Sequence, residues 1–195
     1  MKRIGLCAVA VLASAVSPGL AAWDVETSVG AIPMVMNYQS KEPEANTDWE
    51  LITYPLSISV TFNLNRINRV VTDLRYADFD IPAGKGGLGV SVKGWQLTTA
   101  LQHRFRMTRN IRPWIGGGLV SSVLDVSDRH RTDRDGFLIE RLSDRTDSTM
   151  SAIALAGLEW EITRYWVFAT EARYEVPFSD GLHGYGVGAG LRYQF

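Results

Sequence analysis

The sequence predicts an all-β protein, an eight-stranded antiparallel up-and-down barrel that crosses a membrane with its strands. Beyond residue 22, apolar and polar residues alternate with period two in eight segments, as in strands with two unlike faces. The connections between these segments alternate between short and long. No window beyond residue 22 approaches the roughly 18 uninterrupted apolar residues that a transmembrane helix needs. Strands are therefore the only expected way across a membrane.

The first 22 residues are expected to be a secretory signal peptide. Lys2 and Arg3 precede an apolar run at 4–16, and small residues follow at the expected cleavage site. We place cleavage after Ala22, with cleavage after Ala21 as a close alternative. The barrel domain then spans 23–195.

Composition excludes several classes of site. The chain has 20 basic and 21 acidic residues, and loss of Lys2 and Arg3 leaves 18 against 21, a net charge of −3. This balance does not favour a nucleic-acid partner. Cys7, the one cysteine, is removed with the signal peptide, so disulfides and thiolate metal sites are excluded. We identify no cofactor and no metal site.

The first four predicted strands have clear faces. The first spans 23–35 and is interrupted by Pro33, and the second, at 52–64, has the cleanest alternation and contains Pro55. The third places Arg69, Asp73 and Arg75 on its polar face and ends in a Gly-rich loop at 78–91. The fourth, at 95–106, turns its apolar face away from Arg104 and Arg106.

The last four strands are less even. The fifth, at 112–124, has ambiguous faces, and we assign Trp114, Val120 and Leu124 outward. The longest loop, at 127–148, carries charges of both signs around an apolar patch at 137–139. Strands at 152–162, 166–178 and 185–195 follow, and the glycines of the last are expected to leave inward room for long charged side chains.

Three features favour a membrane barrel over a soluble one. Short turns at 65–68, 107–110 and 163–165 all belong to one end, as periplasmic turns do. The polar faces mix arginine and glutamate with small residues, which suits a narrow interior. Aromatic residues gather at both ends of the apolar faces, as in the two interfacial girdles of membrane barrels. The girdles are expected to include Trp23, Trp49, Trp95, Trp114, Trp160, Trp166 and Phe195.

Local motifs support this architecture. The segment 112–118 reads Arg-Pro-Trp-Ile-Gly-Gly-Gly, Gly157-Leu158-Glu159-Trp160 precedes a short turn, and the chain ends Arg192-Tyr193-Gln194-Phe195. The sequence resembles the small eight-stranded bacterial outer-membrane β-barrels, the group that includes the OmpW, OmpX and OmpA-type barrels. The resemblance implies Sec-type export to the outer membrane of a Gram-negative cell. It also implies contact with outer-membrane lipid and lipopolysaccharide, and recognition of Phe195 by the barrel assembly machinery.

Charged residues on the polar faces are expected to meet in the lumen. They are Asp73, Arg75, Arg104, Arg106, Glu159, Glu161, Glu171, Arg173, Glu175 and Arg192. An interior of eight strands holds little more than side chains, so a structural ion-pair network is the favoured interpretation. The alternative is a gate whose pairs exchange to open a narrow ion path.

Pro33 and Pro55 lie in adjacent strands near the first long loop, and each removes a ladder donor. They lie either simply at strand margins or bulges, or at a lateral opening like that of OmpW-type barrels, through which a small apolar molecule leaves. We therefore expect a porin-like narrow or lateral passive route for small, hydrophobic molecules, or a structural envelope protein. The alternative is surface interaction or adhesion through the long loops, with 137–139 as the contact.

Catalysis is not expected. Some eight-stranded barrels modify lipid A with a histidine beside a serine or an acid near the outer rim. Ser179, Asp180 and His183 supply these residue types, as do Ser127, Asp128 and His130. Such sets are common in loops, and their spacing does not match a His-x-Ser deacylase pattern. No catalytic residue is assigned.

Overall fold

The structure is a computed structural model that describes residues 24–39, 50–83, 86–105, 108, 110–179 and 183–195. The expected signal peptide, Trp23, Trp49 and Arg106 lie outside the described residues. Among the described residues, no helix combines the length and hydropathy required to span a membrane.

The described residues form ten antiparallel strands. They are β1 (Asp24–Ala31), β2 (Met34–Gln39), β3 (Glu50–Asn63), β4 (Asn68–Ile81), β5 (Leu88–Arg104), β6 (Ile111–Thr132), β7 (Leu138–Arg141), β8 (Arg145–Glu161), β9 (Trp166–Pro177) and β10 (His183–Gln194).

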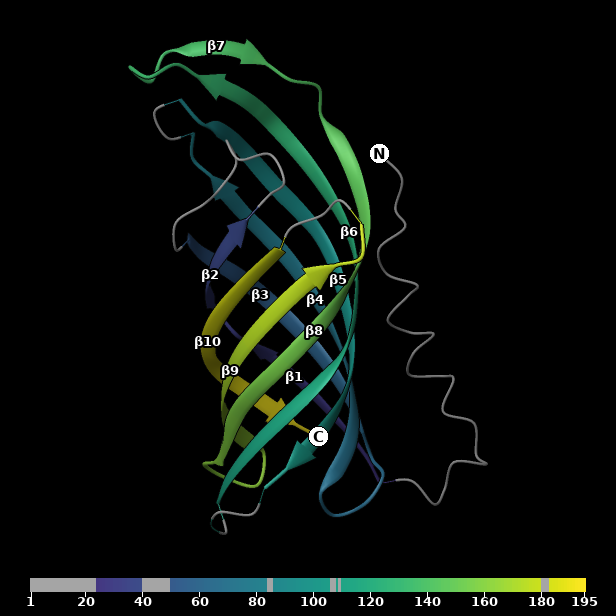
Figure 1. Cartoon of the computed structure of the whole chain (residues 1–195). Coiled ribbons are helices and arrows are strands. Elements are labelled where there is room, and N and C mark those ends of the chain that lie inside the picture. The colour runs from purple at the N-terminus through teal and green to yellow at the C-terminus, as the bar shows by residue number, and fades with distance from the viewer. Residues whose placement is uncertain (1–23, 40–49, 84–85, 106–107, 109, 180–182) are drawn as a thin grey trace.

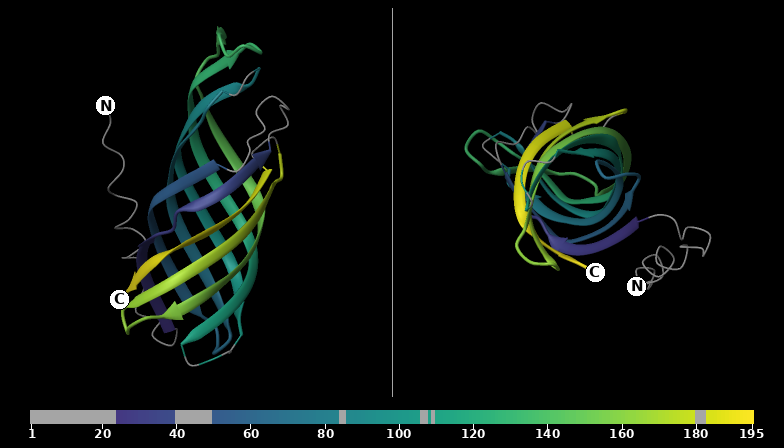
Figure 2. Two further views of the ribbon diagram at one scale, coloured as in Figure 1. Left: turned by 90° about the vertical axis from the view of Figure 1, so that its left-hand side faces the viewer. Right: turned by 90° about the horizontal axis from the view of Figure 1, so that it is seen from below.

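Eight strands close the ring, because β1 and β2 are one ring strand interrupted at Ile32 and Pro33. Both pieces pair with β10 in one continuous register, from Ser28 with Gln194 to Met34 with Gly188. Each ring strand otherwise pairs with its sequence neighbours, and β7 pairs with β6 outside the ring. The closed ring is seen end-on in Figure 2. The all-β, eight-stranded antiparallel barrel predicted from the sequence is confirmed.

The two ends of the barrel differ. Short connections at 64–67, 105–110 and 162–165 lie at one end, which we call the turn end. The other end, the hairpin end, is uneven in height (Figure 1). Strand β6 has 22 residues and β5 and β8 have 17 each, whereas β9 and β10 have 12 each. Because a membrane strand needs about 9–11 residues, one side of the barrel continues well beyond a bilayer's thickness.

Two loops predicted from the sequence are largely strand. Strand β4 runs to Ile81 and β5 starts at Leu88, so the Gly-rich loop predicted at 78–91 shrinks to 82–87. The charged loop predicted at 127–148 is mostly the end of β6, the strand β7 and the start of β8. These strands form the tall side of the barrel, which we call the hairpin extension (Figure 2).

The assignment of faces in β6 was wrong. Trp114 is 2% exposed and, like Val120 and Leu124, points inward, whereas Ile115 is 52% exposed and shares the outer face with Leu119 and Val123. Three successive glycines leave β6 without an alternation to follow in this part. Gly157 on β8 makes room for the indole, since a Cβ there would lie 2.6 Å from Trp114 Cζ2. Trp114 is therefore an interior residue and not part of a girdle.

Candidate functional site

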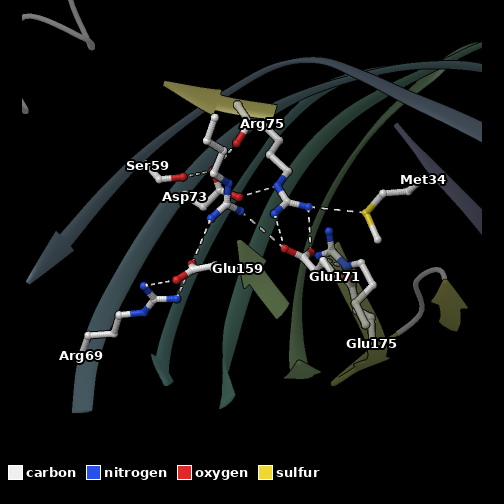
Figure 3. A network of polar contacts seen from close by, with 11 residues as sticks. Met34, Ser59, Arg69, Asp73, Arg75, Glu159, Glu171 and Glu175 are labelled. Atoms are coloured by element: carbon white, nitrogen blue, oxygen red, sulfur yellow. Dashed lines mark hydrogen bonds and ion pairs between the residues drawn. The ribbon is translucent and has the colours of Figure 1, made fainter. Parts of the chain in front are cut away.

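The centre of the lumen is a buried arginine that holds two carboxylates. Arg75 on β4 donates from Nη1 and Nη2 to the two oxygens of Glu171 on β9, at 2.9 and 2.8 Å. Its Nε also donates to Asp73, two residues away on the same inward face of β4. The three side chains point toward one another (Figure 3), and all three are buried.

A second clamp lies beside the first. Arg69 donates to both oxygens of Glu159 on β8, at 3.1 and 2.6 Å, and its Nε donates to Gln102 at 2.8 Å. Arg192 on β10 lies between the clamps, with its guanidinium 3.9 Å from Glu159 and 3.8 Å from Glu171. Bidentate pairs fix geometry as well as charge, so the two clamps tie opposite walls of the barrel together.

Small hydroxyls complete the shell of Asp73. Ser57 and Ser59 on β3 donate to its Oδ1 at 2.7 and 2.9 Å. Both serines are buried, and their small size leaves room for the guanidinium groups that extend from β4. The polar face of β3 thus satisfies a carboxylate without adding charge.

The buried network is balanced in charge. It contains the carboxylates of Asp73, Glu159, Glu171 and Glu175 and the guanidinium groups of Arg69, Arg75, Arg173 and Arg192. Arg173 contacts Glu175 at 3.4 Å. Buried ions are retained only when they are paired, and the interior of eight strands is just wide enough for side chains. We call these eight residues the charged network, and they fill the middle of the lumen.

Two of the expected lumen residues lie nearer the turn end. Arg104 is half-buried and donates to Asn63 at 2.8 Å, and Asn63 donates in turn to Glu26 at 2.9 Å. Glu161 pairs with Arg112 at 2.7 Å, and both side chains are about one-third exposed. These contacts form a rim separate from the charged network.

The expected lumen set left out Arg69, which belongs to the network, and Ser57, Ser59 and Gln102, which donate to or accept from it. Arg69 was placed on the polar face of its strand but was left out of the expected set. All four share inward faces with named residues, so their position in the alternation was the available signal.

Apolar side chains fill the lumen next to the network on the hairpin side. The cluster consists of Ile32, Met34, Ala77, Phe79, Val92 and Leu124, with Val90 and Val126 packed against it. On β4 the inward residues Asp73 and Arg75 are followed directly by the inward residues Ala77 and Phe79. The inner face of the strand therefore changes from charged to apolar between two successive inward positions. We call these eight residues the apolar cluster.

Met34 joins the network and the cluster. Its sulfur accepts a contact from Arg75 Nη1 at 3.5 Å, and it is fully buried (Figure 3). Gly188 on β10 makes this packing possible, because a Cβ there would lie 2.6 Å from Met34 Cγ. The room left by this closing-strand glycine is therefore used by the first ring strand and not by the charged side chains of β9.

The outer wall changes character at the same level. Tyr76 and Trp95 pack edge-to-face on neighbouring strands, with ring centroids 5.1 Å apart. The next outward pair toward the hairpin end is Asp78 with Lys93, whose charged groups lie 3.3 Å apart. On β4 and β5 the outward residues below the aromatic pair are mainly apolar, such as Leu97 and Leu101, and those directly above it are Asp78, Asp80 and Lys93.

Both prolines lie where the wall between the first ring strand and β3 is interrupted. Gly30 pairs with Ser57, and the next pair along is Met34 with Ile52. Strand β3 advances five residues (52 to 57) while its neighbour advances four (30 to 34), so β3 has a one-residue bulge. Pro55 lies in the bulge and Pro33 opposite it.

The interruption has a defined height and is one-sided. Leu56, at the edge of the bulge, pairs with Tyr76 and so lies at the level of the aromatic pair. On its other side the first ring strand stays joined to β10, where Ala189 donates to the carbonyl of Pro33 at 3.3 Å. Among the described residues, 31–33 and 53–56 make no ladder pair with each other.

The remaining expected aromatics lie outside the ring at its two ends. Trp95, Trp160, Trp166 and Phe195 are all exposed. At the turn end Tyr193 packs edge-to-face against both Trp166 and Phe195, at 5.2 and 5.1 Å. The chain end is also tied to the ring, because the amide of Phe195 donates to the carbonyl of Thr27 at 3.0 Å.

The serine, aspartate and histidine sets have no relay geometry among the described side chains. His130 Nδ1 lies 2.7 Å from the backbone carbonyl of Asp128 and not from its carboxylate. Asp180 lies outside the described residues, as does the side chain of His183.

Comparison with known proteins finds the fold and no closer relationship. No protein-family model and no curated protein matches the chain. Among solved structures, Neisserial surface protein A matches with a TM-score of 0.59 and 15% identity, covering 88% of this chain and 97% of that one. The N-terminal β-barrel domain of Pseudomonas aeruginosa OprF matches with a TM-score of 0.57 and 13% identity, covering 89% and 99%.

A third match, with a TM-score of 0.53 and 13% identity, is Ail, the attachment invasion locus protein of Yersinia pestis, in complex with a heparin analogue; it covers 88% of this chain and 99% of Ail. The chain therefore has the fold of the small bacterial outer-membrane β-barrels. This confirms the resemblance inferred from the sequence at the level of architecture.

Proposed function

We propose that the protein is an integral outer-membrane barrel that gives small hydrophobic molecules a passive lateral route from its outer mouth into the membrane. The interruption of the wall at Pro33 and Pro55, beside the apolar cluster, is the observation that carries this proposal. Ile32 and Met34 belong to the cluster and flank Pro33 directly, so the apolar interior reaches the interruption itself.

The charged network supports a lateral path over a vertical one. An apolar molecule that moved down the lumen would have to separate paired, buried ions and leave them without partners, which costs several kcal/mol. A molecule that moved sideways at the interruption would break no ladder hydrogen bond between the two strands. It would leave at the level of Tyr76 and Trp95, which is the depth of an interfacial aromatic girdle.

The proposed placement follows the rules for such barrels. The turn end lies in the periplasm and the hairpin extension outside the cell, with export by the Sec system followed by removal of residues 1–22. The outward apolar residues contact outer-membrane lipid, and the extension lies among lipopolysaccharide headgroups. Phe195, exposed at the turn end, is available to the barrel assembly machinery.

The test is uptake of a hydrophobic fluorophore by cells. A deletion strain should take up the probe more slowly than the parent, and expression of the protein in that strain should restore the rate. Uptake of a small hydrophilic probe is the control and should not change. Equal uptake of the hydrophobic probe by the deletion strain and the parent would overturn the proposal.

The charged network also leads to a separate prediction about the conduction of ions through the lumen. Because both clamps are bidentate and the network is balanced in charge, the lumen should not conduct in planar bilayers. Discrete single-channel steps from purified wild-type protein would instead favour the gate interpretation of the same residues.

Surface interaction is a second candidate function, favoured by the tip of the hairpin extension. Phe137, Leu138 and Ile139 are consecutive and exposed, with Phe137 71% exposed. Asp133 holds the tip, because its Oδ1 accepts from the amides of Asp135 and Phe137 at 2.9 and 2.8 Å. Host-cell binding that survives a Phe137→Ser/Ile139→Ser change would argue against this candidate.

A further inference from the structure

Two turns at the turn end repeat one local pattern. Residues 64–67 read Leu-Asn-Arg-Ile, and residues 162–165 read Ile-Thr-Arg-Tyr. Each has a large apolar residue, then a capping asparagine or threonine, then arginine, then a second large apolar or aromatic residue. The sequence of the third turn also has a threonine, Thr108, directly before an arginine, Arg109, although Arg109 lies outside the described residues.

The two turns are also built alike. Asn65 Oδ1 accepts from the amides of Ile67 and Asn68, at 3.0 and 2.8 Å. Thr163 Oγ1 accepts from the amides of Tyr165 and Trp166, at 3.3 and 3.1 Å. Side-chain capping of this kind is typical of tight turns. It fixes the residue after the cap at the apex, so that Arg66 and Arg164 are both exposed.

Apolar side chains flank each arginine and are themselves exposed. Leu64 and Ile67 lie beside Arg66, and Ile162 and Tyr165 beside Arg164, all at 40–55% exposure. The guanidinium of Arg164 lies over the ring of Tyr165, 5.6 Å from its centroid. A cation between two exposed apolar groups fits the boundary of a bilayer, where the apolar groups enter the acyl region and the cation stays among headgroups.

Charge is distributed unevenly between the two ends. The segments 64–68 and 162–166 contain arginine and no acidic residue. The segment 127–148 at the hairpin end has five arginines against six acidic residues. These two turns therefore present arginine without an acidic residue, and the 162–165 turn lies directly beside the exposed Trp166.

We propose that Arg66 and Arg164 bind the phosphates of anionic phospholipids in the periplasmic leaflet and so fix the depth of the barrel's inner end. An exposed guanidinium donates to phosphate oxygens, and each basic residue near an anionic surface contributes about 1 kcal/mol, or about five-fold in affinity. The flanking apolar side chains select a lipid over a free phosphate, because free phosphate offers them nothing to contact. The proposal does not depend on the lateral route, but it rests on the proposed placement of the turn end in the periplasm.

The test measures binding of phosphatidylglycerol and phosphatidylcholine to the folded barrel in detergent by native mass spectrometry. The variant Arg66→Gln/Arg164→Gln is compared with Arg134→Gln/Arg141→Gln, which removes two exposed arginines from the hairpin extension. Folding of each variant is checked first by gel migration with and without boiling. Inorganic phosphate is added in a separate arm as a competitor.

Wild-type protein should bind phosphatidylglycerol more tightly than phosphatidylcholine. The turn variant should lose that preference by about 25-fold, whereas the extension variant should keep it. Inorganic phosphate at the same concentration should not displace the lipid. Equal affinity of wild type for the two lipids, or equal losses in the two variants, would overturn the proposal. Displacement by inorganic phosphate would overturn the assignment to lipid.

Discussion

The part of the barrel below Tyr76 and Trp95 and the hairpin extension above them are built from the same strands with opposite polarity. Below, the inward residues Asp73 and Arg75 of β4 belong to the charged network and the outer wall is apolar. Above, the interior carries Phe79, Val92 and Leu124, and the outer wall carries Asp78 and Lys93. The lower part has the polarity of a membrane barrel and the upper part that of a water-soluble sheet.

The reversal takes place without any change in strand phase. On β4 the residues Asp73, Arg75, Ala77 and Phe79 all point inward, so period-two alternation is kept while the inner face turns from charged to apolar. Solvent sets the composition of a face, and the surroundings of the wall change at the aromatic level. Mutations on either side of this level should therefore have opposite tolerances.

The largest effect is expected from Arg75→Met. It removes the cation that Asp73 and Glu171 share and leaves both carboxylates buried without it. Loss of one partner of a buried ion pair costs about 3–5 kcal/mol. The free energy of unfolding by urea in detergent micelles should fall by that amount. Arg75→Met/Glu171→Met should recover part of it, and a cost for the single change as small as that of a surface pair would contradict the account.

A change in the apolar cluster should come next. Leu124→Ala removes a buried side chain that packs with Phe79 and Val92 and should lower the unfolding free energy by about 2–3 kcal/mol. Leu124→Asn keeps most of the volume but adds an amide among apolar side chains, and it should be at least as harmful. If Leu124→Asn left the unfolding free energy unchanged in the same urea titration, the cluster would be a water-filled cavity and not a packed core.

The outer wall offers a matched pair on a single strand. Leu119→Arg places a charge about midway along the apolar outer wall of β6 and should cost about 2 kcal/mol or more for a barrel refolded into vesicles. Asp125→Arg lies on the same face beyond the aromatic level and should cost little. Equal costs for the two changes would mean that the bilayer boundary is not at Tyr76 and Trp95.

The smallest effect is expected from Lys93→Met. Lys93 is exposed, and its hydrogen bond to the carboxylate of Asp78 raises the pKa of its ammonium group above the ordinary value. Exposed ion pairs are screened by water and salt, so unfolding should be unchanged within error. A loss as large as that of Arg75→Met would refute the distinction between the two regions.

This reversal also explains where sequence analysis failed. The ring and its inward charges could be predicted because one face stays apolar over a full membrane span, as on β3 and β9. The predicted loops at 78–91 and 127–148 began close to where the apolar residues move from the outer to the inner face of the strand. When only the outer face is followed along the sequence, this change looks like the end of the strand. Trp114 was misplaced for a different reason, since glycines carry no facial signal and only its neighbour Gly157 shows that an indole fits inside.

Pro33 and Pro55 could be found from the sequence because the missing donor is a local property of proline. What the sequence could not show is that the two prolines face each other across one bulge, because that depends on the register between two strands. It also could not show that the bulge lies level with Tyr76, where the polarity reverses. Placing the prolines relative to the apolar cluster required the assembled barrel.

The most direct measurement is uptake of a hydrophobic probe by cells in which a disulfide locks the upper edge of this interruption, so that the two strands cannot part further. Val35 pairs with Leu51 just above the interruption, and residues 23–195 contain no cysteine that could compete for the disulfide. Val35→Cys/Leu51→Cys is compared with Thr72→Cys/Thr99→Cys, which staples the unbroken wall between β4 and β5, where the two hydroxyls lie 3.5 Å apart. Oxidised Val35→Cys/Leu51→Cys should reduce uptake to the level of the deletion strain and recover with reductant, while the control pair stays active. Undiminished uptake through the oxidised, stapled wall would contradict a lateral route at the prolines.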